Sequence, residues 1–360
     1  MDSSRARTPR TVIVTGGTAG VGRAVVAALA RRGDRIGIIA RGTDGLAATR
    51  AEVEQLGGRA LELPCDVADA AAVEAAADRV EREFGPIDLW INAAMSTVFS
   101  LVKDLEPAEL RRVTEVTYLG SMHGVMAALR RMLPRNAGTI VQVGSSLAYR
   151  GIPVQAAYCG AKHAIKGFLD SLHAELLYLR SDVRLTTVHI PAVNTPQFDW
   201  ARTRMGTQPR PVAPVFQPEG IAGHILEAAD NPAREHWVGG STPLVILGSF
   251  AAPGLADRYL AATAVKGQGT GDPLPADRED NLFEPVAGLH RAHGRFDAES
   301  KQVGPSLTAA AARLVAAGSL LALGGGLALA AAAGSRKGSA RPGRDSRLRT
   351  SRLRTAARVR

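Results

Sequence analysis

The chain has 360 residues, of which 46% are apolar, and a formal net charge of +10. A chain of this length and composition can bury a large core, so we expect one globular domain of about 250 residues with additions, and not a fibrous or disordered protein. Its two cysteines, Cys65 and Cys159, exclude a disulfide framework. The start MDSSRARTPR lacks the apolar stretch of a secretory signal, which predicts a cytoplasmic protein.

The positive charge is concentrated at the end of the chain. Residues 335–360 carry nine arginines and one lysine against one aspartate, which accounts for nearly all of the net charge. We therefore expect any electrostatic partner to bind this tail and not the body of the protein.

Apolar β-branched runs alternate with helical patterns through the first half of the chain. The sequence predicts strands over 11–15, 35–40, 60–65, 87–92 and 139–143, with helices over 21–32, 44–56 and 70–84. Repeated βα units predict an α/β fold, a doubly wound parallel sheet with helices on both faces. In such folds the ligand binds at the carboxyl ends of the strands.

The stretch TVIVTGGTAGVGRAVVAALARRG, residues 11–33, places glycines where a predicted strand becomes a helix. Gly16, Gly20 and Gly22 allow unusual backbone angles and let a phosphate approach the helix N-terminus with no Cβ in the way. An ordinary strand-to-helix turn would explain the glycines alone. The βα units around them favour a dinucleotide-binding site.

The end of the second predicted strand, IIARG, indicates which nicotinamide cofactor fits. An acid there would bond the ribose 2′-hydroxyl of NAD. Ala40 stands at that position and Arg41 follows, so a 2′-phosphate would meet a cation and no carboxylate. The sequence therefore favours NADP(H) over NAD(H), with a solvated arginine at a strand end as the alternative.

The stretch VGSSLAYRGIPVQAAYCGAKHAIKGFLDSLHAEL, residues 143–176, places Tyr158 and Lys162 one helical turn apart. A lysine ammonium near the phenol would lower the tyrosine pKa from about 10 toward neutrality. Tyr158 could then exchange a proton with a carbonyl or alcohol oxygen while hydride moves at carbon. Ser145 could hydrogen-bond the same oxygen, and Ser146 is its rival. A surface pair without a catalytic role is the competing interpretation.

These ordered motifs resemble the short-chain dehydrogenase/reductase family, in its single-domain Rossmann branch, from about residue 9 to about residue 245. TGGTAGVG is similar to the family's cofactor loop, and Ser145, Tyr158 and Lys162 match its catalytic serine, tyrosine and lysine. Asp66 matches an acid that contacts adenine, and Lys162 would also bind the nicotinamide ribose. With Arg41, the resemblance implies these cofactor-binding residues: Gly16, Thr18, Gly20, Val21, Gly22, Arg41, Asp66, Val67, Asn92, Tyr158, Lys162 and Thr195.

The chain departs from the family pattern at three places. Ala93 and Met95 replace the second asparagine and the glycine of the Asn-Asn-Ala-Gly element that Asn92 begins. Thr117 stands where relatives have an asparagine that holds a water in a proton relay to the lysine, so the departure concerns the relay and not hydride transfer. PAVNT replaces the usual Pro-Gly before a threonine, and Thr195 is the residue we expect at the nicotinamide carboxamide.

The stretch over residues 195–218 is rich in proline and predicts a loop or lid. It carries Phe198, Trp200 and Phe216, which suggest a hydrophobic carbonyl or secondary alcohol as substrate. Anchoring of the loop to the core would use the same aromatic residues, and this alternative stays open.

The chain after the predicted enzyme domain has a different composition. Residues 314–334 form an uncharged segment that is long enough to cross a bilayer, although its many alanines and glycines make it only weakly hydrophobic. This segment could span a membrane, lie on its surface or pack on a partner. The basic tail after it could be solvated, bind anionic lipid or, as the least favoured alternative, bind nucleic acid. The expected divisions are an arm over 1–10, a Rossmann domain over 11–260, a polar linker over 261–305, an apolar segment over 306–334 and a basic disordered tail over 335–360.

Taken together, the sequence predicts an oxidoreductase that moves hydride between NADP(H) and a carbonyl or secondary alcohol, homo-oligomeric as the family usually is. A non-catalytic nicotinamide-binding sensor or scaffold, tethered through its C-terminus, is the alternative.

Cys159 and His163 are expected to be packing or surface residues. The histidines and cysteines show no spacing typical of a metal site.

Overall fold

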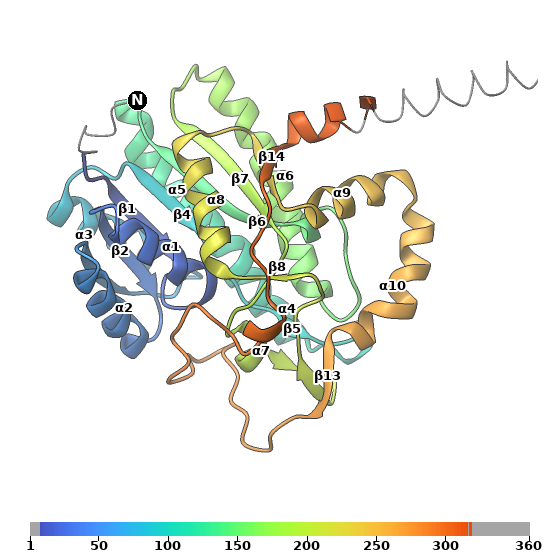
Figure 1. Ribbon diagram of the computed structural model, residues 1–360. Helices are drawn as coiled ribbons and strands as arrows, with labels where there is room; N and C mark the ends of the chain where they lie inside the picture. Colours follow the sequence, from blue (N-terminus) through green and yellow to red (C-terminus); the bar gives the residue numbers. More distant parts are fainter. Residues whose placement is uncertain (1–7, 316, 319–360) are drawn as a thin grey trace, which may run out of the picture. The chain divides into compact units, whose positions relative to one another are not determined.

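The computed structural model describes residues 8–315 and 317–318, and the chain divides into two units, residues 1–312 and 313–360. The centre of the first unit is an eight-stranded sheet in the order β14-β12-β7-β6-β4-β1-β2-β3 (Figure 1). Its strands are β1 (Thr11–Thr15), β2 (Arg35–Ala40), β3 (Arg59–Pro64), β4 (Leu89–Asn92), β6 (Thr139–Ser145), β7 (Arg184–Ile190), β12 (Glu235–Val238) and β14 (Ser306–Thr308).

The order of the strands fixes where a ligand can bind. Every pairing in this sheet is parallel except that of β14, which runs antiparallel to β12. From β1 the chain builds outward through β2 and β3 on one side, and then crosses to β4, β6, β7 and β12 on the other. The reversal between β1 and β4 leaves a crevice at the carboxyl ends of these strands, where doubly wound folds bind their ligands.

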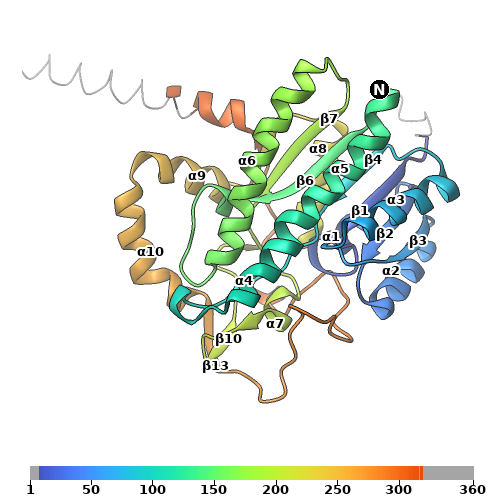
Figure 2. The same cartoon turned by 180° about the vertical axis from the view of Figure 1, so that it is seen from behind.

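Each strand buries alternate side chains on opposite faces of the sheet. Val12 and Val14 of β1 pack into one core cluster, whereas Ile13 packs into the other. The first cluster is covered by α1 (Gly20–Ala30), α2 (Thr43–Gln55) and α8 (Pro218–Asp230). The second is covered by α3 (Ala70–Phe84), α5 (Gly120–Met132) and α6 (Ala156–Tyr178), which lie together in Figure 2. Burial of both faces explains why the strand sequences are continuously apolar.

Local signals set several helix ends. Asp69 caps α3 by accepting hydrogen bonds from the amides of Ala71 and Ala72 at 2.9 and 3.0 Å, and Gly85 ends that helix with φ of 86°. Glu106 and Glu109 form a reciprocal capping box at the start of α4 (Pro107–Val113). Such caps satisfy amides that have no partner within the helix.

The other regular elements are short or lie outside the central layers. The helices are α7 (Gln197–Trp200), α9 (Ser241–Ala251) and α10 (Pro253–Gly267), with a π-helical turn η2 (Thr114–Leu119) and 3-10 turns η1 (Val102–Asp104), η3 (Leu133–Arg135), η4 (Ser146–Ala148) and η5 (Asp297–Glu299). Three two-stranded sheets pair β5 (Val98–Phe99) with β9 (Arg202–Thr203), β8 (Ala192–Val193) with β11 (Val215–Phe216), and β10 (Thr207–Pro209) with β13 (Gly269–Pro273).

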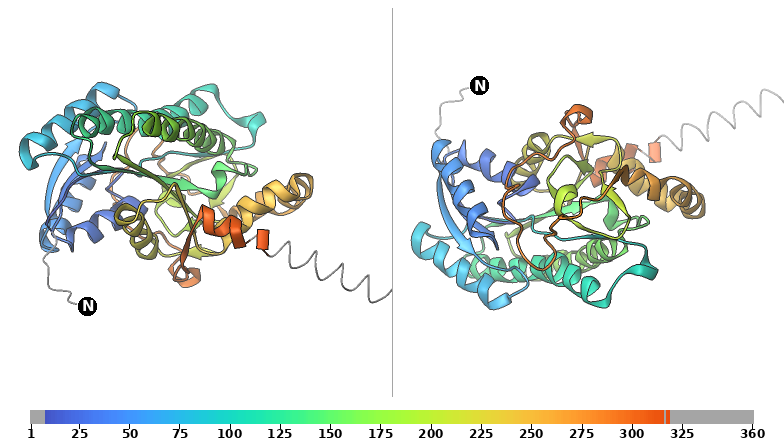
Figure 3. Two further views of the ribbon diagram at one scale, coloured as in Figure 1. Left: turned by 90° about the horizontal axis from the view of Figure 1, so that it is seen from above. Right: turned by 90° about the horizontal axis from the view of Figure 1, so that it is seen from below.

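Residues 261–305 differ from the polar linker that their composition predicts. The stretch begins inside α10, contributes β13, and then runs across the carboxyl end of the sheet to β14, with the 3-10 turn η5 on the way (Figure 3, right). Leu282 is fully buried there against Val98, Val113 and Ala157. These residues are part of the first unit, because they pack through Leu282 and accept hydrogen bonds from Arg41, Arg112 and Gly20 at their backbone carbonyls.

Most of the apolar segment 314–334 and all of the basic tail 335–360 lie outside the described residues. In the part of the chain that the structure describes, helices that combine the length and the apolar character needed to cross a bilayer are absent. The membrane association predicted for residues 314–334 stays a prediction.

Candidate active site

The glycine-rich joint between β1 and α1 brings three stretches of backbone into close contact. Gly16 has φ of +71°, and a Cβ there would lie 2.7 Å from the Cα of Ala94. At Gly22 a Cβ would lie 2.2 Å from the carbonyl oxygen of Gly16. Only glycine fits at these two positions, so the tight turn aims the N-terminus of α1 at the crevice beside β4.

The predicted catalytic residues come together at the carboxyl end of β6. Ser145 is the last residue of β6, and Tyr158 and Lys162 lie one turn apart in α6. The Ser145 side chain hydrogen-bonds Tyr158, so Ser145 and not its neighbour Ser146 faces the tyrosine. The Nζ atom of Lys162 lies 5.5 Å from the centre of the Tyr158 ring and donates to the carbonyl oxygen of Val143 at 2.8 Å.

Burial changes the acidity of both groups. It raises the pKa of Tyr158 well above the ordinary value of 10, and the hydrogen bond from Ser145 opposes that rise. Burial also lowers the pKa of Lys162 to about 8. A lysine that is 4% exposed and donates to a backbone carbonyl is costly to keep charged, which is typical of a functional position. The predicted lowering of the Tyr158 pKa toward neutrality is not seen in the protein without its cofactor, because burial is the largest influence on this group and raises its pKa.

The residues expected at the adenine, Asp66 and Val67, follow the carboxyl end of β3. Asp66 follows β3 and forms an ion pair with Arg112 of α4, which sequence reasoning missed because nothing in the pattern around Arg112 distinguishes it from a surface arginine. The carbonyl of Val67 is 2.9 Å from Nδ1 of His123. A cleft of about 600 Å³ opens here, lined by Asp66, Pro107, Ala108, Arg111, Arg112, Glu115, Phe283 and Glu284.

Asn92 ends β4 and is fully buried. Its side chain accepts a hydrogen bond from the indole of Trp90 at 2.9 Å and donates to the carbonyl of Ser121 at 3.1 Å. The amide is thus used within the protein, and it fixes β4 against α5. A contact between Asn92 and a cofactor would fall to its backbone.

Thr117 lies in the π-helical turn that connects α4 to α5. Its hydroxyl accepts from the amide of Ser96 and donates to the carbonyl of Ser96, both at 3.0 Å. A hydroxyl has a single proton to donate, so Thr117 has none left for a water. This residue holds the loop after β4 in place and does not supply the side-chain donor that an asparagine would.

Residues 281–291 accept hydrogen bonds from Arg41 and Gly20, which the sequence assigns to the cofactor, and from Arg112, which it does not. Arg41 donates to the carbonyl oxygens of Asn281 and Phe283 at 2.5 and 2.6 Å, and Arg112 donates to that of Leu282 at 3.1 Å. The amide of Gly20, at the start of α1, donates to the carbonyl of Arg291 at 2.9 Å. These carbonyl oxygens present partial negative charge where phosphate oxygens are expected.

The same contacts test whether the residues present suit a dinucleotide. The glycine turn leaves no room for a Cβ, and Ala40 at the end of β2 carries no acid. Among the described residues, the donors of Arg41 and Gly20 bond neutral carbonyl oxygens. These donors are of the kind that binds an anion. The residues therefore fit a phosphate-bearing cofactor once residues 281–291 move aside. Nothing in the composition of that stretch predicted its position.

Thr195 reaches the opposite side of the same joint. Its Cβ would lie 3.1 Å from a Cβ placed on Gly20, so the loop after β8 and the glycine turn are in contact. Thr18 and Val21 lie within that turn and are both partly exposed. Thr195 therefore lies beside Gly20, and its contact with the nicotinamide carboxamide stays a prediction.

The aromatic residues of the 195–218 loop pack against other parts of the protein. The ring of Phe198 lies 6.0 Å from Phe99 and 5.9 Å from Phe296, and that of Trp200 lies 6.0 Å from His290. Trp200 and Phe216 are buried. These contacts favour the anchoring role for the aromatics, and they tie the loop to the stretch that follows β13.

Comparison with known proteins gives the family. The short chain dehydrogenase family matches residues 10–205. An uncharacterized oxidoreductase, YxnA of Bacillus subtilis (strain 168), is 26% identical over 281 residues, which cover 78% of this chain and 79% of the relative. A putative oxidoreductase, SadH of Mycobacterium tuberculosis (strain ATCC 25618 / H37Rv), is 31% identical over 52% of this chain and 67% of its own.

A third relative carries a more specific name. A 3-oxoacyl-[acyl-carrier-protein] reductase of Bos taurus is 34% identical over 163 residues, which cover 45% of this chain and 68% of the relative. The match to the family spans more than half of the chain and includes the glycine turn, β6 and the start of α6. The protein belongs to the short-chain dehydrogenase/reductase family of NAD(P)-dependent oxidoreductases.

Proposed function

We propose that this protein reduces a carbonyl group, or oxidises the corresponding alcohol, with NADP(H) as the hydride carrier. The observation that supports it most is the meeting of Ser145, Tyr158 and Lys162 beside the glycine turn that starts α1. The bound nicotinamide would supply or accept the hydride. The protein itself has to hold the reacting oxygen and move one proton.

The roles of the three residues follow from their contacts. Ser145, held through its hydrogen bond to the amide of Leu147 at 3.1 Å, orients the carbonyl oxygen beside the tyrosine. Tyr158 donates its proton to that oxygen as negative charge develops on it. The Lys162 ammonium lies close enough to stabilise the phenolate that remains, and it would also hold the nicotinamide ribose.

The preference for NADP(H) rests on Arg41 and its surroundings. No carboxylate follows β2, and the arginine already binds backbone carbonyl oxygens through two of its nitrogens. A 2′-phosphate would form stronger, charge-assisted bonds with the same nitrogens. Binding then requires residues 281–291 to give up their bonds to Arg41 and to Gly20, so this stretch competes with the cofactor.

The substrate class is the least constrained part of the proposal. The aromatic residues of the loop that carries Thr195 pack against Phe99, Phe296 and His290, so their contacts do not themselves select a substrate. The proposal of a hydrophobic carbonyl compound rests on the apolar composition of this loop. The name of the Bos taurus relative makes 3-oxoacyl thioesters a natural group to include beside aliphatic, aromatic and polycyclic ketones.

A panel assay of the full chain tests the proposal. Oxidation of NADPH and of NADH is followed with each carbonyl compound, and Tyr158→Phe is the matched control because it removes only the hydroxyl. Turnover with NADPH that is lost in Tyr158→Phe is the expected result. Turnover that survives the substitution, or that prefers NADH, would contradict the assignment of the proton donor or of the cofactor.

The non-catalytic sensor is the second candidate, and one observation favours it. Residues 281–291 occupy the donors of the anion site, as an internal regulator of nicotinamide binding would. Tight NADPH binding that releases this stretch, with no turnover of any carbonyl in the panel, is the result expected for a sensor. Isothermal titration of NADPH into the full chain, run beside the panel assay, separates the two candidates.

A further inference from the structure

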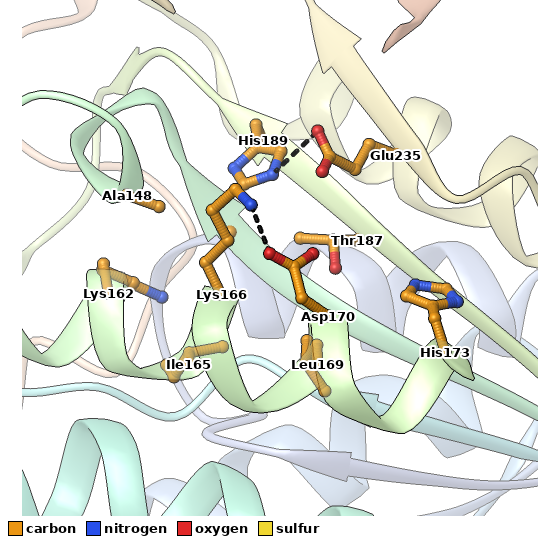
Figure 4. A pocket seen from close by; sticks show the side chains of 11 residues that line it. Ala148, Lys162, Ile165, Lys166, Leu169, Asp170, His173, Thr187, His189 and Glu235 are labelled. Carbon is orange, nitrogen blue, oxygen red and sulfur yellow. Dashed lines mark hydrogen bonds and ion pairs between the residues drawn. The ribbon is translucent and has the colours of Figure 1, made fainter. Parts of the chain in front are cut away.

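A small cavity, partly open to solvent, lies between α6 and β7 and is lined in part by Lys162 (Figure 4). Its volume of about 10 Å³ is close to what one water molecule needs. In the figure, Lys162, Lys166 and Asp170 project from α6 while His189 and Glu235 come from the sheet. The cavity is lined by Gly144, Ala148, Lys162, Ile165, Lys166, Leu169, Asp170, His173, Thr187, His189 and Glu235.

His189 presents an unused nitrogen in this cluster. Its Nδ1 lies 2.9 Å from the carbonyl oxygen of Ser145, and because a carbonyl only accepts, Nδ1 carries the proton. The other nitrogen, Nε2, is then a bare acceptor. It makes no hydrogen bond with any described residue although the side chain is only 2% exposed. Such a buried polar atom requires a partner.

Glu235 faces that nitrogen at 3.7 Å. Its carboxylate accepts from the hydroxyl of Tyr149 at 2.6 Å and from the indole of Trp237 at 2.9 Å. Burial acts to raise the pKa of Glu235, but these bonds hold it below its usual value. Burial lowers the pKa of His189 to about 4. A neutral imidazole and a carboxylate, both acceptors, therefore face one another, and a water with its two protons satisfies both.

Lys162 reaches the same cavity from the side of the catalytic tyrosine. One of its three protons goes to the Val143 carbonyl, so two are left for other partners. The far end is closer to solvent, because the side chain of Asp170 is 40% exposed and pairs with Lys166 and Arg234, each at 2.6 Å. The charged and titratable groups that face His189 are Lys162, Lys166, Asp170 and His173 of α6, Glu235 of β12 and Tyr149 after η4.

We propose that His189 and Glu235 are positioning residues that hold one water against Lys162, and that this water passes protons between Lys162 and the solvent at the Asp170 end. The inference rests on the proposed function. In each reduction Tyr158 gives its proton to the substrate oxygen, and the Lys162 ammonium gives one to the phenolate. The water then gives one to the lysine amine and takes one from solvent, so the proton count closes and no electrons move in these steps. Thr117, whose one proton goes to Ser96, is not needed on this path.

His189→Asn is the test, because an asparagine amide can keep the bond to the Ser145 carbonyl while Nε2 is removed. We expect kcat for NADPH-dependent reduction to fall about tenfold or more and the solvent deuterium isotope effect on kcat to increase, with the Kd of NADPH unchanged. In the cofactor-free chain, carbon NMR of labelled lysine should show the pKa of Lys162 lowered by about half a unit or more, because the ammonium loses a hydrogen-bonded water. A role in packing alone would leave the isotope effect and the lysine titration unchanged.

Two further variants complete the design. His189→Gln returns a polar atom near the place of Nε2 and should restore part of kcat, and it serves as the test if the asparagine variant does not fold. His163→Asn, on the exposed side of α6, should change nothing. A folded His189→Asn with unchanged kcat, isotope effect and lysine titration would overturn the inference. If the wild type reduces no carbonyl while the lysine titration still shifts, the proposed function is wrong and the water link between His189 and Lys162 holds.

Discussion

Two regions meet at the carboxyl end of the sheet, and they are held there by different forces. The β1–α1 joint is fixed by the core, since Val12, Val14, Val25 and Leu29 on either side of the glycines are all fully buried. Residues 281–291 bury one large side chain completely, Leu282, and otherwise depend on hydrogen bonds from arginines and amides to their carbonyl oxygens. Packing makes the first region permanent, whereas the second can exchange its bonds for those of a ligand.

Tyr158→Phe acts on the permanent region and should have the largest effect. Loss of the proton donor predicts a fall in kcat of about 10²- to 10⁴-fold, because phenylalanine has no proton to give to the substrate oxygen. Stopped-flow or steady-state NADPH oxidation measures it, with NADPH binding as the control that should stay unchanged. An activity within about threefold of the wild type would contradict the role of Tyr158 as the proton donor.

Lys162→Met separates stability from function in the same helix. The folded-state pKa of about 8 lies below the ordinary 10.5, so burial of the ammonium destabilises the fold at pH values below about 8. That cost fades between about pH 8 and 10.5, where the unfolded chain binds more protons, so stability should rise with pH in this window. The methionine variant should be more stable by about 2 kcal/mol at pH 7 in urea unfolding, yet inactive. Equal free energies of unfolding for the two proteins at pH 7 would contradict the idea that the buried Lys162 ammonium destabilises the fold.

Leu282→Ala acts on the exchangeable region. Removing this side chain weakens the packing of residues 281–291 by about 2 kcal/mol. If this stretch competes with the cofactor, the Kd of NADPH should fall on the order of tenfold. Fluorescence titration measures the change, and Leu255→Ala, an exposed leucine of α10, is the matched control. A weaker affinity would instead make Leu282 part of the cofactor site.

The smallest predicted effect is a pH dependence of the same region. Burial acts to lower the pKa of His293, but hydrogen bonds to Asp297 and Glu219, both 2.7 Å, raise it above the ordinary 6.5. A raised histidine pKa stabilises the folded arrangement fully below about pH 6.5, and the contribution is lost as the pH rises through the folded-state pKa. Limited proteolysis after Gly288 should therefore be faster at pH 8.5 than at pH 6. His293→Gln should abolish the difference, and a wild type with equal rates at both pH values would refute the linkage.

The sequence predicted the permanent region well for a physical reason. A strand buried on both faces and a helix buried on one leave a hydrophobic period in the sequence, so β1, β2 and α3 have the residue limits that the pattern predicted. The proposed catalytic set could be picked out from the sequence because Ser145, Tyr158 and Lys162 are close in the chain. The exchangeable region has no such period, since its backbone atoms make the contacts. Arg112 and His189 were missed because their roles arise from partners that are distant in the chain.

Hydrogen exchange of the full chain, with and without saturating NADPH, tests most directly whether the cofactor binds at this end of the sheet in place of residues 281–291. We expect slower exchange in residues 15–23 together with faster exchange in residues 281–291, because the cofactor takes over the donors that now hold that stretch. Slower exchange in both stretches would mean that residues 281–291 close over the cofactor, and unchanged exchange in both would contradict cofactor binding at the glycine turn.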